Sequence, residues 1–200
     1  MTRSNPVRTD GLLLIGASAG GPAAVAAIIK QLPADFRAAI VLAQHVDSVF
    51  VPTLATWLSQ QGVLPVRVAV EGDRPESGRM LVADSKRHLV FKSRHRLGYT
   101  TVPENSAHYP SIDTFFQSAA RFCSANDVAI LLTGMGRDGA AGLKLLREAG
   151  VMTIAQDAPS SAVYGMPKAA AEADAAKEIL ALNAIAPRLL SIFRRNVKPI

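Results

Sequence analysis

The sequence predicts an α/β fold of three layers, in which a mainly parallel, doubly wound sheet is covered by helices on both faces and accompanied by a small antiparallel hairpin. Two observations lead to this prediction. Short, continuously apolar runs, typical of strands buried on both faces, alternate along the chain with longer segments whose apolar residues recur at helical spacing. The 14 glycines and 12 prolines separate these runs as turns, and 49% hydrophobic residues in 200 suffice for one buried core.

The chain opens with a strand, a glycine turn and a helix. We expect the strand over residues 12–15 and a tight turn over residues 16–21. Pro22 suits the first position of a helix that continues to about Leu32, because the proline ring presets the helical φ angle. Residues 1–10 are polar, and we expect them to be a flexible leader.

The next elements extend to residue 110. A strand over residues 38–42 ends shortly before Gln44 and His45, and a helix follows over residues 48–60. Further strands are expected at residues 66–70, 80–83 and 89–91, the last two pairing as the antiparallel hairpin, and residues 93–110 are expected to be irregular.

The last third repeats the alternation of strand and helix. Ser111 is a suitable cap for a helix that continues to about Ser124. The remaining expected elements are a strand at residues 128–132, a helix at 139–149 closed by Gly150, a strand at 151–155, a short helix at 167–173 and a last helix at 184–195 capped by Asn183. Residues 11–195 then form a single domain, with residues 196–200 as a tail.

Composition argues against several classes of protein. The net charge of +6 is scattered and has little aromatic interleaving, so we expect solvated faces and no nucleic-acid surface. No apolar stretch reaches the roughly 18 residues that span a bilayer, and the start lacks a secretory pattern. We therefore expect a cytoplasmic protein without membrane insertion. The single Cys123 lies among apolar residues and is expected to be a buried structural thiol.

Three polar residues come immediately after predicted strands: Ser18 after the first, His45 after the second and Asp138 after the strand at residues 128–132. Because the strands are parallel, all three lie on the same edge of the sheet, where open α/β sheets bind their ligands. A serine hydroxyl becomes a nucleophile when a base takes its proton, and a carboxylate keeps that base in the right tautomer. Ser18, His45 and Asp138 are therefore a candidate nucleophile, general base and orienting carboxylate.

The turn around Ser18 favours this chemistry. Glycines at 16, 20 and 21 leave room for a substrate carbonyl, and the serine stands at a helix N-terminus, whose free N–H groups favour a developing negative charge. The backbone of residues 133–136 could supply a further donor.

Each of these residues also has a purely structural interpretation. Ser18 could cap its helix, His45 could be a satisfied histidine at a strand end, and Asp138 could cap the helix at residues 139–149. The combination of the three favours catalysis.

Other sites are poorly supported. Residues 16–20 match the G-x-S-x-G elbow of α/β-hydrolases, but that elbow comes late in its sheet and its histidine comes last in the chain. The dinucleotide and Walker glycine patterns are incomplete. His88, His95 and His108 lack the close spacing of zinc ligands, so we expect neither a metal nor a cofactor.

The residues around the candidate triad resemble the catalytic domain of the chemotaxis response-regulator methylesterases, the CheB family. The resemblance covers nearly the whole chain, from Gly11 to about Phe193. The segments that carry it are IGASAGG (15–21), QH (44–45), RHL (87–89), PSID (110–113), LTGMGRDGAAG (132–142), AQ (155–156) and GMP (165–167).

This resemblance implies a function. Ser18, His45 and Asp138 match the catalytic triad of the family, Met135 matches a residue whose backbone helps to hold the oxyanion, and Ala19 and Gly134 line the same cleft. The implied reaction is hydrolysis of glutamate methyl esters on the cytoplasmic helices of methylated chemoreceptors, with release of methanol. Some members of the family also deamidate glutamine on the same receptors.

The chain also departs from the family. These 200 residues lack the usual N-terminal receiver domain, so we expect either a stand-alone esterase or one controlled by a separate regulatory protein. Asp84-Ser85 replaces a common Pro-Gly, Tyr109 replaces a common Arg, and Ala19 replaces a common Thr or Ser. Two other functions stay open: an esterase or amidase of the same mechanism with a substrate outside chemotaxis, and a non-catalytic binding module for an acidic partner.

Overall fold

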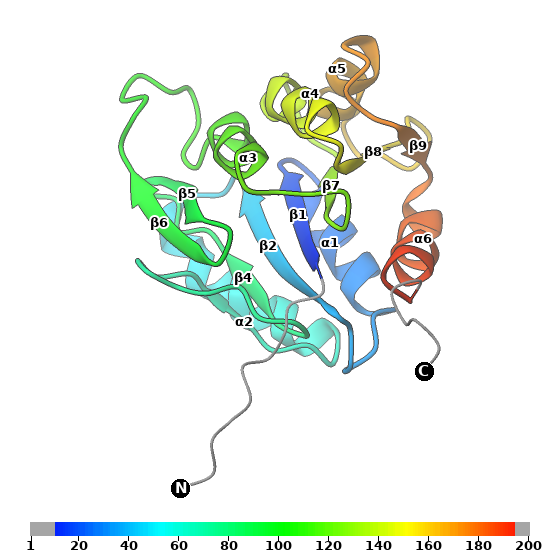
Figure 1. The fold of residues 1–200 in the computed structure, drawn as a ribbon, viewed down its shortest axis with the longest axis horizontal. Coiled ribbons are helices and arrows are strands. Elements are labelled where there is room, and N and C mark those ends of the chain that lie inside the picture. The colour runs from blue at the N-terminus through cyan, green and yellow to red at the C-terminus, as the bar shows by residue number, and fades with distance from the viewer. Residues whose placement is uncertain (1–10, 195–200) are drawn as a thin grey trace, which may run out of the picture.

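The computed structural model describes residues 11–194, which form the expected α/β architecture (Figure 1). One sheet has the strand order β3-β4-β2-β1-β7-β8-β9, and all of its neighbouring strands are parallel. Its strands are β1 (Gly11–Ala17), β2 (Ala38–Gln44), β3 (Val66–Val68), β4 (Met80–Val82), β7 (Val128–Leu131), β8 (Met152–Gln156) and β9 (Glu178–Leu180). The predicted doubly wound sheet is confirmed.

Helices cover both faces of this sheet. They are α1 (Gly21–Ile29), α2 (Val51–Gln61), which follows the short 3-10 helix η1 (Ser48–Phe50), α3 (Ile112–Ala120), α4 (Ala140–Glu148), α5 (Met166–Glu172) and α6 (Leu182–Arg194). The buried side chains form two clusters, one between the sheet and α1, α2 and α6, the other between the sheet and α3, α4 and α5.

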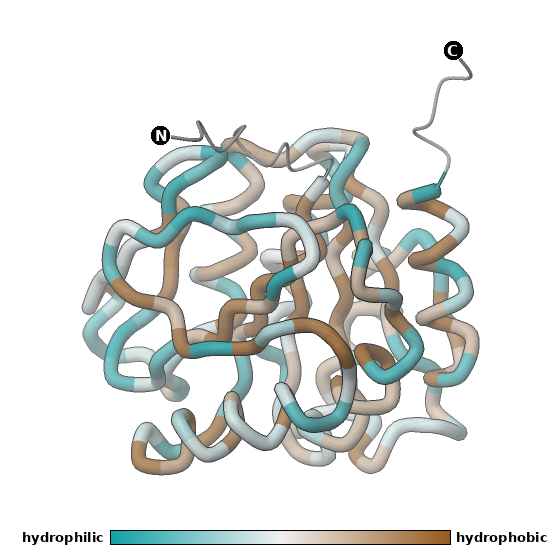
Figure 2. The backbone as a smooth tube through the Cα atoms, turned by 90° about the horizontal axis from the view of Figure 1, so that it is seen from below, coloured by the Kyte–Doolittle hydropathy of each residue, from teal (hydrophilic) through white to brown (hydrophobic). Residues whose placement is uncertain are grey.

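The strands contribute to both clusters because successive side chains point to opposite faces of the sheet. Leu13 and Ile15 of β1 join the first cluster, whereas Leu12 and Leu14 join the second. This explains why the strands read as continuously apolar runs in the sequence. In Figure 2, segments of hydrophobic residues run through the middle of the molecule.

The antiparallel hairpin lies elsewhere than expected. It consists of β5 (His88–Ser93) and β6 (Arg96–Thr100), so the prediction that residues 80–83 pair with 89–91 was wrong. Residues 80–82 instead form β4, buried between β2 and β3 in the parallel sheet. The segment expected to be irregular contains β6, in which Leu97 and Tyr99 are buried against the second cluster.

Two further expectations at the C-terminal side need correction. The edge strand β9 was not predicted, because it is only 3 residues long and its Ile179 is half exposed. Asn183 lies inside α6 and does not cap it. The leader expected at residues 1–10 and the tail expected at 196–200 lie outside the described residues.

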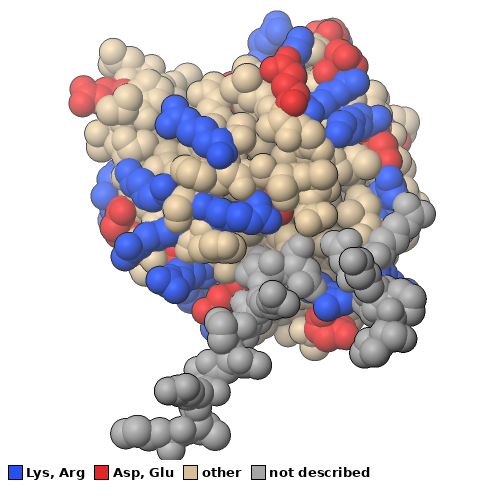
Figure 3. Space-filling model, viewed as in Figure 1, with Lys and Arg blue, Asp and Glu red and all other residues tan. Residues whose placement is uncertain are grey.

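The charged side chains are scattered over the surface, as the sequence predicts. In Figure 3, Lys and Arg side chains are spread over the face of the molecule with acidic residues between them. Among the described helices, none is long and apolar enough to cross a membrane.

Candidate active site

The register of β1 and β2 brings Ser18 and His45 together. Ala17, the last residue of β1, pairs with Gln44, the last residue of β2, and the next residue on each strand is the predicted serine or histidine. The backbone N–H of His45 donates to the oxygen of Ala17 over 3.0 Å, which continues the ladder past the strand ends. Because neighbouring strands lie about 4.8 Å apart, the two side chains emerge side by side at the carboxyl edge of the sheet.

The turn that carries Ser18 is fixed by the loop after β7. The N–H of Ser18 donates to the oxygen of Thr133 over 3.0 Å, and the Thr133 hydroxyl donates to the oxygen of Ala19 over 2.9 Å. A Cβ atom at Gly134 would lie 2.7 Å from the Cβ of Ser18. Glycine at position 134 is therefore what lets this loop pass so close to the serine.

The imidazole of His45 uses its two nitrogens differently. Its Nε2 lies 2.8 Å from Oδ2 of Asp138, and the exposed fractions of the two side chains are 9% and 12%. Its Nδ1 is buried and has no hydrogen-bond partner among the described residues. An imidazole that donates from Nε2 to a carboxylate carries its free lone pair on Nδ1, so Nδ1 is the nitrogen available to accept a proton.

Asp138 is held as a carboxylate by the N-terminus of α3. Its oxygens accept the backbone N–H groups of Ile112 over 2.7 Å and of Asp113 over 2.9 Å, and the hydroxyl of Ser111 over 3.2 Å. Burial raises the pKa of Asp138, but the hydrogen bonds from His45 and from these backbone amides outweigh it and lower the pKa to about 2. The group that faces His45 is thus ionised over the whole physiological pH range.

The N-termini of α3 and α4 each donate backbone hydrogen bonds to a carboxylate that lies at the start of the other helix. Asp113 of α3 accepts the N–H of Gly142 in α4 over 2.7 Å, while Asp138, just before α4, accepts from α3. Burial and the negative charge of Asp138 raise the pKa of Asp113. The N-cap of α4 is Gly139, without a side-chain hydrogen bond. Asp138 therefore caps α3 and not α4, contrary to the structural alternative considered for it.

Three backbone N–H groups were candidates for holding an oxyanion. That of Gly134 donates to the oxygen of Val163 over 3.0 Å and is therefore occupied. Those of Ala19 and Met135 donate no hydrogen bond within residues 11–194, and both residues are exposed. The free donors thus flank Ser18 from its own turn and from the loop after β7.

Two residues that the site depends on were assigned no role from the sequence, although both lie in segments that carry the resemblance. Gln44 is buried, and its Nε2 donates to the backbone oxygens of Ser18 over 2.9 Å and of His45 over 3.0 Å. It ties the two segments together. A polar residue at the buried end of an apolar strand was the available signal. The capping by Asp113 had no such signal, because its partner lies 29 positions further along the chain.

The other groups considered from the sequence lie apart from this chemistry. Cys123 follows α3 and is partly buried, and burial raises the pKa of its thiol to about 12, which makes it a poor nucleophile. Within residues 11–194, no group of three or more His, Cys, Asp or Glu side chains could hold a metal ion.

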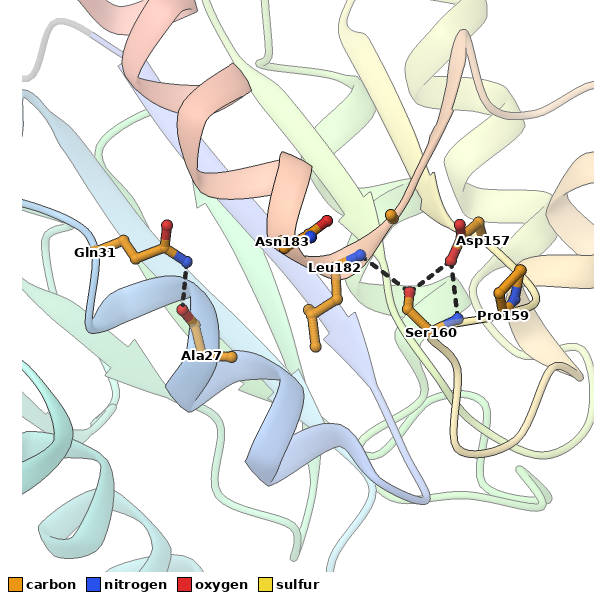
Figure 4. Close-up of a pocket in the computed structure, with 8 residues that line it drawn as sticks. Ala27, Gln31, Asp157, Pro159, Ser160, Leu182 and Asn183 are labelled. Atoms are coloured by element: carbon orange, nitrogen blue, oxygen red, sulfur yellow. Dashed lines mark hydrogen bonds between the residues drawn. The ribbon is translucent and has the colours of Figure 1, made fainter.

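A cavity of about 400 Å³ is lined by the C-terminal part of α1 and by the segments that follow β8 and β9, and it contains none of the triad residues (Figure 4). Its polar groups bond to one another, since Ser160 accepts from the backbone N–H of Leu182 and bonds to Asp157. It therefore presents few unsatisfied groups to a ligand. Its lining residues are Ala27, Gln31, Asp157, Pro159, Ser160, Ala181, Leu182 and Asn183.

Comparison with known proteins agrees with the resemblance. The family model described as CheB methylesterase matches residues 13–189. The chain is 56% identical over 191 residues to protein-glutamate methylesterase/protein-glutamine glutaminase 3 of Pseudomonas savastanoi pv. phaseolicola, covering 96% of this chain and 57% of that protein. It is 53% identical over 196 residues to protein-glutamate methylesterase/protein-glutamine glutaminase of Mesorhizobium japonicum, covering 98% of this chain and 58% of that protein.

A solved structure has the same fold. The crystal structure of the Thermotoga maritima CheB methylesterase catalytic domain superimposes with a TM-score of 0.86 at 30% sequence identity, covering 90% of this chain and 97% of that one. This chain therefore spans nearly the whole of a catalytic domain but less than two thirds of the two longer relatives.

Proposed function

Because the chain belongs to the CheB methylesterase family, we propose that it is a protein-glutamate methylesterase, a serine hydrolase that removes methyl groups from glutamate side chains of chemoreceptors. The observation that carries this proposal is the state of His45. Its Nε2 is bonded to an ionised carboxylate, and its Nδ1 is buried, unpaired and next to Ser18 in the strand register. A binding module has no need of this arrangement.

The proposed reaction proceeds through an acyl-enzyme. Ser18 Oγ attacks the ester carbonyl while Nδ1 of His45 takes its proton, and Asp138 stabilises the resulting imidazolium. The N–H groups of Ala19 and Met135 stabilise the negative charge on the carbonyl oxygen. The imidazolium then gives this proton to the departing methoxide oxygen as the C–O bond breaks, so that methanol leaves and His45 is again neutral.

Water completes the cycle. With His45 again acting as base, a water molecule attacks the acyl-enzyme and releases a glutamate carboxylate. The same two steps with a glutamine side chain release ammonia, so one site can serve both activities that the relatives' names describe.

The surroundings of the site support a protein substrate. Exposed hydrophobic side chains lie on the segments that follow β2, β7 and β8 at the carboxyl edge, and on the loop after β6, whose His108 contacts His45. They are Val49, Phe50, Val102, Met135 and Val163. Exposed apolar side chains grouped around a site are typical of an interaction surface. We propose that this apolar rim contacts the methylated cytoplasmic helices of the receptor, which also locates the enzyme in the cytoplasm.

Methanol release from methyl-labelled chemoreceptor membranes tests the proposal. We expect release by the native chain, none by Ser18→Ala, and a large loss in Asp138→Asn. If the folded native chain releases no methanol from any receptor yet reacts at Ser18 with a serine-directed phosphonate, it is a hydrolase with another substrate. Absence of both reactions would favour the binding module.

A further inference from the structure

The segment between β6 and α3, residues 101–110, forms a loop that leaves β6 and returns to the start of α3 (Figure 1), and we call it the strap. Most of its residues are exposed. Its His108 stacks on the imidazole of His45, with 4.3 Å between ring centroids and 21° between ring planes. The resemblance to the family assigned no role to this histidine, and the reaction outlined above does not use it.

The strap is anchored from beneath by a second histidine. His88 is fully buried; its Nδ1 accepts the N–H of Ser111 over 2.9 Å, and its Nε2 donates to the oxygen of Pro103 over 3.1 Å. The ring of Tyr109 stacks on the same imidazole, at 4.4 Å and 16°. Three contacts with one rigid side chain thus fix the strap at both ends.

This anchor fixes the strap relative to the carboxylate. Ser111 is the N-cap of α3, and Asp138 docks on that same helix terminus through its hydrogen bonds to the first backbone amides. The ring of His108 and the carboxylate of Asp138 are therefore both held in place by the N-terminus of α3.

The imidazole of His45 needs a second constraint. One hydrogen bond at Nε2 fixes the distance to Asp138 but leaves the ring free to tilt about that bond. A parallel ring 4.3 Å away on one face restricts this tilt and keeps water from that face. It also presents a π surface to the imidazolium that forms when the base takes a proton.

We propose that His108 is a positioning residue that holds His45 with its Nδ1 directed at Ser18. The inference rests on the proposed function, since it requires His45 to be the general base. It does not depend on which ester is the substrate, so the reaction of Ser18 with a small serine-directed phosphonate is the appropriate measurement.

The test compares the second-order rate constant of that reaction in three variants of the whole chain. His108→Ala removes the ring and should slow labelling by about threefold to tenfold, the range that one aromatic contact is worth. His108→Phe keeps a ring in the stack and should restore most of the native rate. His95→Ala changes another exposed histidine, on the turn between β5 and β6, and should react at the native rate.

Several results would overturn the inference. These are a native rate in His108→Ala, and an equal loss in His108→Phe, which would mean that stacking is not the cause. On methylated receptor the loss should fall on kcat; a raised KM with unchanged kcat would assign His108 to substrate contact instead. If the native chain itself does not react with the phosphonate, the proposed function fails together with this inference. That outcome is seen in the native chain alone, whereas failure of the inference about His108 is seen only when the variants are compared with a native chain that reacts.

Discussion

The carboxylate of Asp138 has a structural task as well as a chemical one, and Asp138→Asn separates them. The side chain accepts hydrogen bonds from His45 and from the N-terminus of α3, where a negative charge is favoured by the helix dipole. Asparagine keeps the shape and one acceptor oxygen but loses the charge. We therefore expect the variant to be folded, to have lost most of its activity and to be less stable.

The size of the stability loss follows from the pKa. Its folded value of about 2, compared with 3.8 for an ordinary Asp, corresponds to about 2 kcal/mol of folding free energy at pH 7. Because the folded pKa is the lower one, the folded state binds fewer protons. This contribution is therefore complete above about pH 5 and is lost as the pH falls towards 2. By the same relation, about 1 kcal/mol remains at pH 3.

Urea unfolding of the native chain and of Asp138→Asn at pH 7, 5 and 3 measures this term. Other carboxylates titrate in both proteins, so the difference in unfolding free energy between them isolates Asp138. We expect a difference of about 2 kcal/mol at pH 7 and 5 that falls by roughly half at pH 3. A difference near zero at pH 7, or one that does not change with pH, would refute the electrostatic account of this carboxylate.

Three further predictions concern the groups around the triad. Gly134→Ala should lower the rate of phosphonate labelling at Ser18 by tenfold or more, because the added methyl would displace the serine; a native rate would contradict the close approach. Gln44→Leu removes two buried hydrogen bonds and should lower the unfolding free energy by about 1–3 kcal/mol in urea titrations, whereas an unchanged midpoint would show that the amide does not tie the strands. Met135→Ala shortens an exposed side chain and keeps the backbone N–H, so KM for receptor should rise with kcat unchanged; a fall in kcat alone would place the side chain in the chemistry.

The sequence indicates which strand ends meet, but it does not indicate every strand pairing. Ser18, His45 and Asp138 each follow a buried strand, and the carboxyl ends of parallel strands meet at one edge, so their proximity followed from topology. The pairing of residues 80–82 was predicted wrongly, because a short apolar run does not show which strand it pairs with. Such a run can form a hairpin or join a parallel sheet, and residues 80–82 do the latter.

Other features depend on contacts between distant segments. The docking of Asp138 on the N-terminus of α3 joins positions 26 residues apart, and neither residue carries a local sign of the other. The stack of His108 on His45 depends on the path of an irregular segment, which periodicity does not describe. Such contacts require the three-dimensional structure.

We propose that Ser18 is the nucleophile that demethylates receptor glutamates. The most direct test is to treat the native chain with a radiolabelled serine-directed phosphonate to graded extents, map the adduct by mass spectrometry, and measure methanol release from methyl-labelled receptor membranes on the same samples. We predict one adduct per chain, on the peptide that contains Ser18, with methanol release falling in proportion to the labelled fraction. An adduct at another residue, or full methanol release from fully labelled chains, would contradict the claim.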